Sequence, residues 1–416
     1  MTENRKISFI IPARNNLKYL RFAYQALREN CTQKDHEICV ADDFSEDGTW
    51  QWCQEIMKVD KNFKAIRNEG PTRLGHTILY DTLINEVATN DIVMIYHADM
   101  VAALFFDEAI LANIKPRTVV SATRIEPPLH PLGVEKVTKD FTSEPETFPM
   151  EKFRDYAYGL YLSNAAETTK GIFAPWAIYK EDFQSIGGHD PLYAPQSKED
   201  SDIFNRFLLN GYKLLQARDA FVYHFTCRGS RFNPLLTQVG KNSTEWDTQN
   251  YKSSRNFIRK WGSFVRHSEY MLPIVPHKYN VAAHLTGASL EHVGVFEPFF
   301  DVTYVDNNAL VNKYVAHEQK NTTYDLRERV RNSTDSLYHE KHDILIYFDL
   351  KHITPATMDF LMNLSENLDK LIDCNNIEEQ LVKEGTVVYE GEGLMPRVEI
   401  TNVQYYENDL IKLKGE

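Results

Sequence analysis

His97 and Asp99, an imidazole and a carboxylate, stand at the end of one short apolar run. Residues Ile92 to Tyr96 are rich in Ile, which is typical of a buried strand in a mostly parallel sheet. Ligands bind beyond the carboxyl ends of such strands, and side chains two residues apart on a strand point the same way. The two groups are therefore placed to face one metal-bound diphosphate. Asp also commonly ends strands as a turn former, so the pair alone leaves both interpretations open.

Polar residues follow the other apolar runs in the same way. Residues Ile7 to Ile11 lead into Pro12, and residues Glu37 to Ala41 lead into a pair of acids. The carboxyl ends of parallel strands meet at one edge of a sheet. We therefore expect one polar edge made of Pro12 to Asn15, Asp42 and Asp43, Arg73, and His97 with Asp99.

Helical patterns alternate with these strands. Residues Asn15 to Asn30 place Leu and Tyr at spacings of three and four, which makes one apolar stripe. Residues Lys64 to Arg67 read as a further strand, and His76 to Val87 as an amphipathic helix. Alternating strands and helices predict an α/β fold with a doubly wound, mostly parallel sheet.

Three of these segments together carry a family resemblance. They are Ile10-Ile11-Pro12, Ala41 to Thr49 (ADDFSEDGT) and Asn68-Glu69-Gly70. The set resembles the nucleotide-sugar half of family 2 glycosyltransferases with the GT-A fold, whose usual string is close to V-D-D-x-S-x-D-G-T. His97-Ala98-Asp99 falls where that family has its D-x-D metal motif, with His97 in place of the first Asp.

The resemblance implies a donor site and a metal site. It places the donor against Pro12, Ala13, Asn15, Asp42, Asp43, Arg73, His97 and Ala98. Asp42 and Asp43 would meet the base and ribose, and Asp99 would bind Mn²⁺ or Mg²⁺. One carboxylate is compatible with Mg²⁺, which uses few protein ligands, and a nearby imidazole is tolerable for Mn²⁺.

An acceptor half follows in the sequence. Gly171 to Tyr179 reads as a core strand, Gly187 to Asp190 (GGHD) as a turn, and Asp202 to Asn210 as a helix. The resemblance extends over about residues 7 to 230. It implies that Asp200 is the general base and that His224, at the end of a strand from Tyr212, is a further metal ligand. The alternatives are a capping box that begins at Ser197 and a half-buried His at a strand end.

Composition is that of an ordinary globular protein. Of 416 residues, 43% are hydrophobic and 25% are charged. We find no apolar run near the roughly 18 residues of a membrane helix and no signal-peptide pattern, so a cytoplasmic location without a membrane span is expected. The five cysteines are scattered without a C-x-x-C pair, which favours reduced thiols.

Charge is distributed unevenly and suggests three segments. Residues 277–416 carry −11 of the net charge of −13, whereas residues 226–266 carry +6 with interleaved aromatic residues. We expect a GT-A domain over 1–225, with its nucleotide-sugar half at about 1–100 and its acceptor half at about 101–225. A basic aromatic helical arm over 226–272 and a smaller acidic α/β or α+β domain over 277–416 would follow. The arm either packs its aromatic face on the protein or offers cations to an acceptor.

The acidic C-terminal segment resembles no family we can name. Strands are expected at Asn280 to Leu285, Val302 to Val305 and Ile344 to Phe348, and helices at Leu310 to Glu318 and Ala356 to Ile372; Thr386 to Leu413 is expected to be β-rich. Packing, homo-oligomer formation and acceptor positioning remain alternatives for its role.

The leading hypothesis is an inverting, metal-dependent glycosyltransferase. Its expected donor is a nucleotide-diphosphate sugar, a UDP-sugar in the first instance, and its expected acceptor is the hydroxyl of a saccharide. One alternative acceptor is a hydroxymethyl pyrimidine in viral DNA, reached through the basic arm. The other alternative is a catalytically degenerate sugar-nucleotide-binding or scaffold protein, suggested by His97 in the metal motif.

Overall fold

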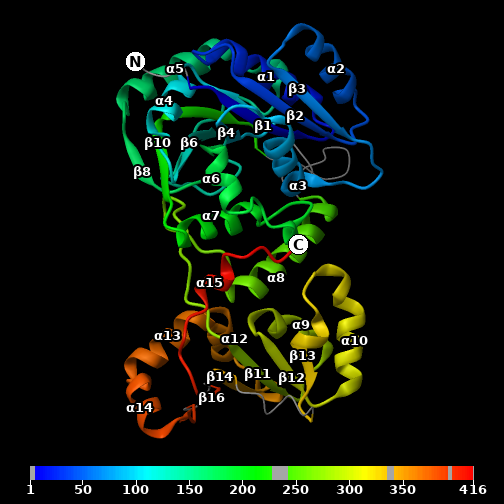
Figure 1. The fold of residues 1–416 in the computed structure, drawn as a ribbon, viewed down its shortest axis with the longest axis vertical. Coiled ribbons are helices and arrows are strands. Elements are labelled where there is room, and N and C mark those ends of the chain that lie inside the picture. The colour runs from blue at the N-terminus through cyan, green and yellow to red at the C-terminus, as the bar shows by residue number, and fades with distance from the viewer. Residues whose placement is uncertain (1–4, 227–241, 335–341, 392–395, 416) are drawn as a thin grey trace. The chain divides into compact units, whose positions relative to one another are not determined.

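The computed structural model describes residues 5–226, 242–334, 342–391 and 396–415. These form two compact units (Figure 1). Unit 1 contains Met1–Asn250 and His267–Ile274, and unit 2 contains Tyr251–Arg266 and Val275–Glu416. Whether the three segments expected from the sequence fold independently stays a prediction. None of the helices within the described ranges is long and apolar enough to cross a membrane.

Unit 1 is built on one mixed, mostly parallel sheet. Its main strand order is β3-β2-β1-β4-β9-β6-β10-β5. The four strands of the N-terminal half run parallel: β1 (Ile7–Ala13), β2 (Glu37–Asp43), β3 (Phe63–Asn68) and β4 (Ile92–Ile95). In the other half, β9 (Trp176–Tyr179) is antiparallel to β4 and β6 (Thr118–Glu126), β10 (Lys213–His224) is parallel to β6, and β5 (Met100–Ala102) is antiparallel to β10. The expected α/β fold is confirmed.

Two short strands and eight helices complete the elements described in unit 1, the last helix continuing into unit 2. The strands are β7 (Lys136–Thr138) on β6 and β8 (Thr168–Lys170) on β10. The helices are α1 (Leu17–Asn30), α2 (Thr49–Val59), α3 (Gly75–Thr82), α4 (Phe106–Asn113), α5 (Met150–Ser163), α6 (Lys180–Ser185), α7 (Glu199–Leu209) and α8 (Thr244–Trp261).

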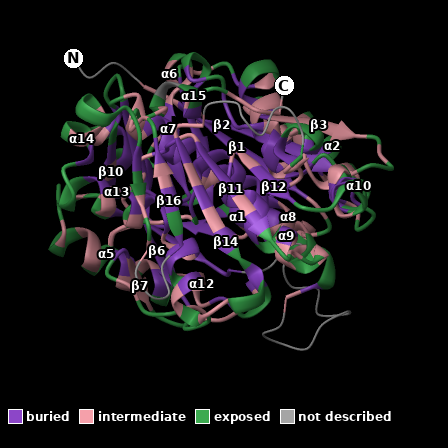
Figure 2. Cartoon of the chain, turned by 90° about the horizontal axis from the view of Figure 1, so that it is seen from below, coloured by how far each residue is buried: buried purple, intermediate pink, exposed green. Residues whose placement is uncertain are grey.

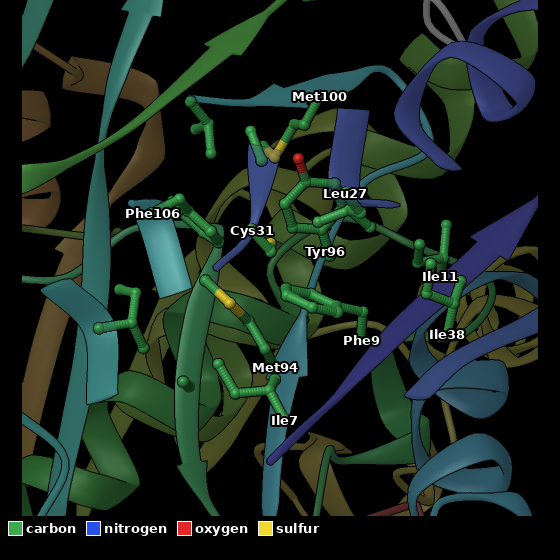
Figure 3. Close-up of a cluster of buried hydrophobic side chains, with 14 of the residues drawn as sticks. Ile7, Phe9, Ile11, Leu27, Cys31, Ile38, Met94, Tyr96, Met100 and Phe106 are labelled. Atoms are coloured by element: carbon green, nitrogen blue, oxygen red, sulfur yellow. The ribbon is translucent and has the colours of Figure 1, made fainter. Parts of the chain in front are cut away.

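The apolar strands supply the core because alternate residues on both faces are covered by helices. Phe9 of β1 packs edge-on against Tyr96 and stacks near Phe106, with ring centroids 5.6 and 6.4 Å apart. Figure 3 shows these rings gathered with aliphatic side chains such as Ile7 and Met94. Figure 2 shows β1 and β2 almost wholly in the colour of buried residues. The sheet therefore fixes the strand ends that carry polar groups.

Several expected bounds differ from the observed ones. Gly171 to Tyr179 contains a strand only from Trp176, because Gly171 to Pro175 makes no ladder. The helix expected from Asp202 begins three residues earlier, at Glu199. The helix over His76 to Val87 ends its regular part at Thr82 and continues as one π-helical turn.

Unit 2 contains a second sheet, with strand order β13-β12-β11-β14-β16-β15. Its four parallel strands are β11 (Val281–Thr286), β12 (Val302–Val305), β13 (Val330–Asn332) and β14 (Ile344–Asp349), and its antiparallel edge is β15 (Val387–Tyr389) and β16 (Arg397–Ile400). The helices are α9 (Leu290–Phe296), α10 (Asn308–Glu318), α11 (Leu326–Arg329), α12 (Pro355–Met362), α13 (Leu364–Cys374), α14 (Ile377–Glu384) and α15 (Glu407–Leu410). The prediction of a second α/β or α+β domain is confirmed.

Two expectations for unit 2 are corrected. The helix expected over Ala356 to Ile372 is two helices, α12 and α13, which meet at Asn363. The segment from Thr386 to Leu413 is β-rich only as far as Ile400, and a short helix follows it. Four described cysteines, Cys31, Cys39, Cys53 and Cys374, are free thiols, whereas Cys227 lies outside the described residues.

The basic arm buries three of its cations in its described part. Arg255, Arg259 and Lys260 on α8 are buried. Arg259 pairs with Glu297 and Glu318 at 2.9 and 2.7 Å, and Arg255 pairs with Glu318 at 2.9 Å. Of the two interpretations left open for the arm, these contacts favour packing within the protein for Arg255 and Arg259, because acids of unit 2 pair with both. Residues 227–241 of the arm lie outside the described ranges.

Candidate active site

A cavity of about 480 Å³ opens in unit 1 at the ends of the central strands. Its wall includes Pro12 after β1, His97 after β4, and His224 at the end of β10. The loop before α7 contributes from the other half of the sheet, with Gln196 and Ser197. A second hollow of about 590 Å³ lies along α1 and contains none of these imidazoles. The first cavity is therefore the candidate site.

Two imidazoles and one carboxylate in this cavity form a candidate metal site. The nitrogen and oxygen atoms that His97, Asp99 and His224 could offer to a cation lie within 4.8 Å of one another. The antiparallel pairing of β5 with β10 aligns Met100 with His224, which brings Asp99 beside the ring. His224 Nε2 lies 3.4 Å from Asp99 Oδ1. Nitrogen and oxygen donors in this arrangement fit a divalent transition metal.

The charge states of the two imidazoles differ. Burial lowers the pKa of His97 to about 3, and the nearby charge of His224 acts in the same direction. Burial also opposes the charged form of His224, but Asp99 and Glu126 outweigh burial and raise its pKa to about 9. At physiological pH the ring of His97 is therefore neutral. The ring of His224 carries a positive charge that offsets the negative charges of Asp99 and Glu126.

Two neighbouring acids at the start of α7 line the same cavity. Glu199 and Asp200 each have one buried carboxylate oxygen, Glu199 Oε2 and Asp200 Oδ1, that has no hydrogen-bond partner among the described residues. Burial raises the pKa of Glu199 to about 7, and the charge of Asp200 adds to this shift. Burial likewise raises the pKa of Asp200, which the charge of His189 partly offsets. Buried acids with raised pKa values and one unbonded oxygen are candidates for proton transfer.

Asp202 and Ser197 have structural contacts instead. Asp202 is fully buried, and its carboxylate accepts from Arg206 Nε at 2.7 Å and from Tyr193 at 3.2 Å. Ser197 donates to Asn250 Oδ1 at 2.7 Å, and the residue before α7 is Lys198. The alternative of a capping box at Ser197 is therefore wrong, because α7 has no side-chain cap of this kind.

The acids after β2 brace loops beside the cavity. Asp43 accepts from the backbone N–H groups of Leu74 and Gly75 at 3.0 and 2.9 Å. Asp42 accepts from the Ser45 N–H at 3.1 Å and is completely buried. Neither residue is part of the cavity wall. A direct contact with a donor base stays a prediction for both.

The remaining predicted donor residues divide between wall and support. Ala98 lines the cavity, whereas Ala13 is the buried end of β1. Asn15 supports the loop after β2, because its N–H donates to Ser45 Oγ at 3.0 Å and its side-chain oxygen accepts from the Glu46 N–H at 2.9 Å.

Arg73 bridges the loop after β3 to the start of α8. Its guanidinium donates to Gln196 at 2.6 Å and to Glu245 at 3.1 Å, and its Nε lies 3.6 Å from Asp43. Gln196 is a wall residue and Arg73 is not. The structure therefore places Arg73 directly behind the wall.

Several wall residues were missed by the sequence reading. They are His76, Tyr80, Arg124, Glu126, His130, Glu135, Lys136, Phe173, Trp246 and Met271. Glu126 has a weak sequence signal, because this acid directly follows Val119 to Ile125 (VVSATRI), a segment rich in β-branched residues. The others come from strands, from two helices and from connecting segments, where spacing in the sequence does not indicate a site.

The N-terminal part of the chain matches a known family. Residues 8–158 match the family model described as Glycosyl transferase family 2. The predicted resemblance is confirmed over these residues, which make up the larger part of unit 1. A search of curated proteins by sequence gave no match.

Solved structures of low sequence identity share parts of the fold. One is GalNAc-T7 with UDP, GalNAc and Mn²⁺ (17% identity, TM-score 0.46, 62% of this chain and 48% of that chain covered). Another is the mannosyltransferase PcManGT from Pyrobaculum calidifontis with GDP-Man and Mn²⁺ (16%, TM-score 0.41, 62% and 64% covered). A third is S. aureus TarS 1-349 (15%, TM-score 0.39, 61% and 80% covered). The chain thus spans about half of the first structure and less than two thirds of the second.

Proposed function

We propose that this protein is an inverting, metal-dependent glycosyltransferase that transfers a sugar from a nucleotide-diphosphate sugar to a saccharide hydroxyl. The observation that carries the proposal is one cavity with two chemically distinct groups. His97, Asp99 and His224 gather on its wall, and the unpaired acids Glu199 and Asp200 belong to the same wall. The family match over residues 8–158 supports the reaction class.

The cluster of His97, Asp99 and His224 would hold Mn²⁺ or Mg²⁺ beside the donor diphosphate. The cation would offset the negative charge that builds on the leaving diphosphate. Pro12 and Ala98 are uncharged residues of the same cavity wall. Asp42, Asp43 and Arg73 would serve the donor by holding the loops after β2 and β3, through their contacts to Ser45, Gly75 and Gln196.

Asp200 would act as the general base. The acceptor O–H bond breaks and its proton passes to Asp200 while the acceptor oxygen bonds to the anomeric carbon. The bond from that carbon to the diphosphate breaks on the opposite face, which inverts the centre. A positioned base is worth roughly 10²- to 10⁴-fold in rate, and Asp200 has a buried oxygen free for this proton.

A UDP-sugar is the donor we propose to test first. A saccharide is favoured over DNA as acceptor because the described arm cations Arg255 and Arg259 are engaged by Glu297 and Glu318. The charges of these two arginines are therefore not available to an acidic polymer such as DNA.

The direct test is incubation of the full chain with a panel of radiolabelled sugar nucleotides and Mn²⁺. We expect slow donor hydrolysis with one donor and transfer with a matching saccharide. DNA that carries hydroxymethylated pyrimidines is the alternative acceptor in the panel. Absence of hydrolysis, transfer and donor binding across the panel would refute the proposal, and binding without turnover would indicate a degenerate enzyme.

A further inference from the structure

Glu126 lies directly behind His224 in the cavity wall. It is the last residue of β6 and its side chain is 1% exposed. His224 Nδ1 donates to Glu126 Oε1 at 2.9 Å, while the other ring nitrogen, Nε2, lies 3.4 Å from Asp99. The imidazole is thus fixed at one nitrogen, with the other directed at the candidate metal site.

This arrangement decides which nitrogen can bind a cation. Binding of a cation requires the neutral ring, so His224 must release one proton. A neutral imidazole whose Nδ1–H donates to a carboxylate presents the lone pair of Nε2, and such partners commonly orient metal ligands. We propose that Glu126 is a positioning residue that sets the ring orientation and tautomer of His224 for metal binding. This inference depends on the metal site of the proposed function.

Glu126 is itself held rigidly by two cations. Arg124 Nη1 lies 2.8 Å from its Oε1, and Lys136 Nζ lies 3.2 Å from its Oε2. Arg124 is anchored in turn over the Phe173 ring, 3.9 Å from the ring centroid. The parallel pairing of Ile125 with Tyr223 keeps the ends of β6 and β10 level. The carboxylate therefore has little freedom to turn away from His224.

A structural alternative is that Glu126 only neutralises Arg124 and Lys136. Glu135 provides the matched control, because it lies 3.6 Å from Arg124 and 4.0 Å from Lys136. No contact between Glu135 and His224 occurs in the described structure. A role through His224 thus predicts different effects for Glu126 and Glu135, whereas charge balance predicts similar ones.

The test measures Mn²⁺ binding to the full-length protein by titration calorimetry and pulsed electron paramagnetic resonance. Glu126→Gln should weaken Mn²⁺ binding by roughly 10- to 100-fold and change the ¹⁴N coupling of one of two imidazoles. Glu135→Gln should leave the affinity and the couplings unchanged. Glu126→Asp keeps the charge for Arg124 and Lys136 but withdraws the oxygen from Nδ1, so it should also weaken binding with the fold intact by circular dichroism.

The outcomes separate the inference from the function on which it depends. Wild-type affinity and couplings in both Glu126 variants would overturn the inference, as would equal losses in Glu126→Gln and Glu135→Gln. His97→Ala and His224→Ala test the metal site itself. Unchanged Mn²⁺ binding in these two variants would instead refute the metal site of the proposed function.

Discussion

At the scale of single residues, three acids within four positions of α7 have different surroundings. Asp200 faces the cavity with an unpaired oxygen, whereas Asp202 is paired with Arg206. Their neighbours in space, not their order in the sequence, set what each can do.

The first prediction therefore separates these two acids. Asp200→Asn removes the basic lone pair and should lower kcat by roughly 10²-fold or more, with an unchanged Kd for the nucleotide sugar. Asp202→Asn should leave kcat of the folded enzyme much less affected and lower thermal stability, because Arg206 loses its charged partner. Steady-state kinetics and donor titration check this, and full activity in Asp200→Asn would rule out the assigned base.

The second prediction concerns Glu199 and pH. Burial raises the pKa of Glu199 from 4.5 to about 7, so between these values the folded state keeps a proton that the unfolded chain releases. Stability should therefore fall as pH rises from about 4.5 to 7, by on the order of 3 kcal/mol from this group. Glu199→Gln should remove that loss, so that its melting temperature matches wild type at pH 5 and exceeds it at pH 8. A constant difference between the two proteins across this range would contradict the prediction.

The third prediction concerns the choice of cation. Mg²⁺ prefers oxygen ligands, whereas the transition metal Mn²⁺ tolerates imidazoles better, so Mn²⁺ should support faster turnover than Mg²⁺ after chelator treatment. Asp99→Ala should abolish turnover and leave the circular dichroism spectrum unchanged. Full activity in excess chelator would remove the metal from the mechanism.

At the scale of elements, strands were predictable where apolar runs are short and end in polar residues. Val302 to Val305 was predicted with the observed bounds, and β1, β2 and β4 within two residues. The contact between Glu126 and His224 was not predictable from the sequence, because strand pairing brings together two residues that are 98 positions apart. Helix α7 was placed late because Lys198, in a left-handed conformation, begins it without the expected Ser197 cap.

The arm shows the same limit of a sequence reading. Its cations were recognised, but their partners Glu297 and Glu318 lie in the acidic segment far along the chain. The sequence of a positively charged segment does not indicate which acids pair with it in the folded protein.

The fourth prediction follows from that buried network on α8. Arg259→Ala leaves Glu297 buried with one fewer cation and should destabilise unit 2 by roughly 3–5 kcal/mol, without changing Mn²⁺ affinity in the folded protein. Arg266→Ala is the control, because Arg266 is partly exposed where it meets Glu366 and should cost about 1 kcal/mol or less. Calorimetric unfolding checks both, and equal small effects would show that the network contributes little.

At the scale of the whole molecule, the cavity belongs to one unit and the stabilising ionic network to the other. Residues His97, Asp99 and His224 all lie in unit 1, and Glu297 and Glu318 in unit 2. The candidate metal site and the buried ionic network can therefore be tested with separate variants.

The fifth prediction uses that separation. A fragment of residues 1–276 should bind Mn²⁺ with the affinity of the full chain, because it keeps all three ligands. It should also aggregate more readily, because Ile258 on α8 loses the apolar cluster of unit 2 against which it packs. Titration calorimetry and light scattering measure the two effects, and a folded fragment without Mn²⁺ affinity would show that unit 2 completes the site.

Helix α8 runs unbroken from Thr244 to Trp261 while the division between the units falls after Asn250. One residue inserted between Arg255 and Arg259 would rotate one arginine relative to the other by about 100° around the helix axis, so that both could no longer pair with Glu318. An exposed loop tolerates gained or lost residues, but this buried stretch of helix does not. Length variation among relatives should therefore avoid Tyr251 to Trp261, and an exchange of unit 2 should carry this half of α8 with it.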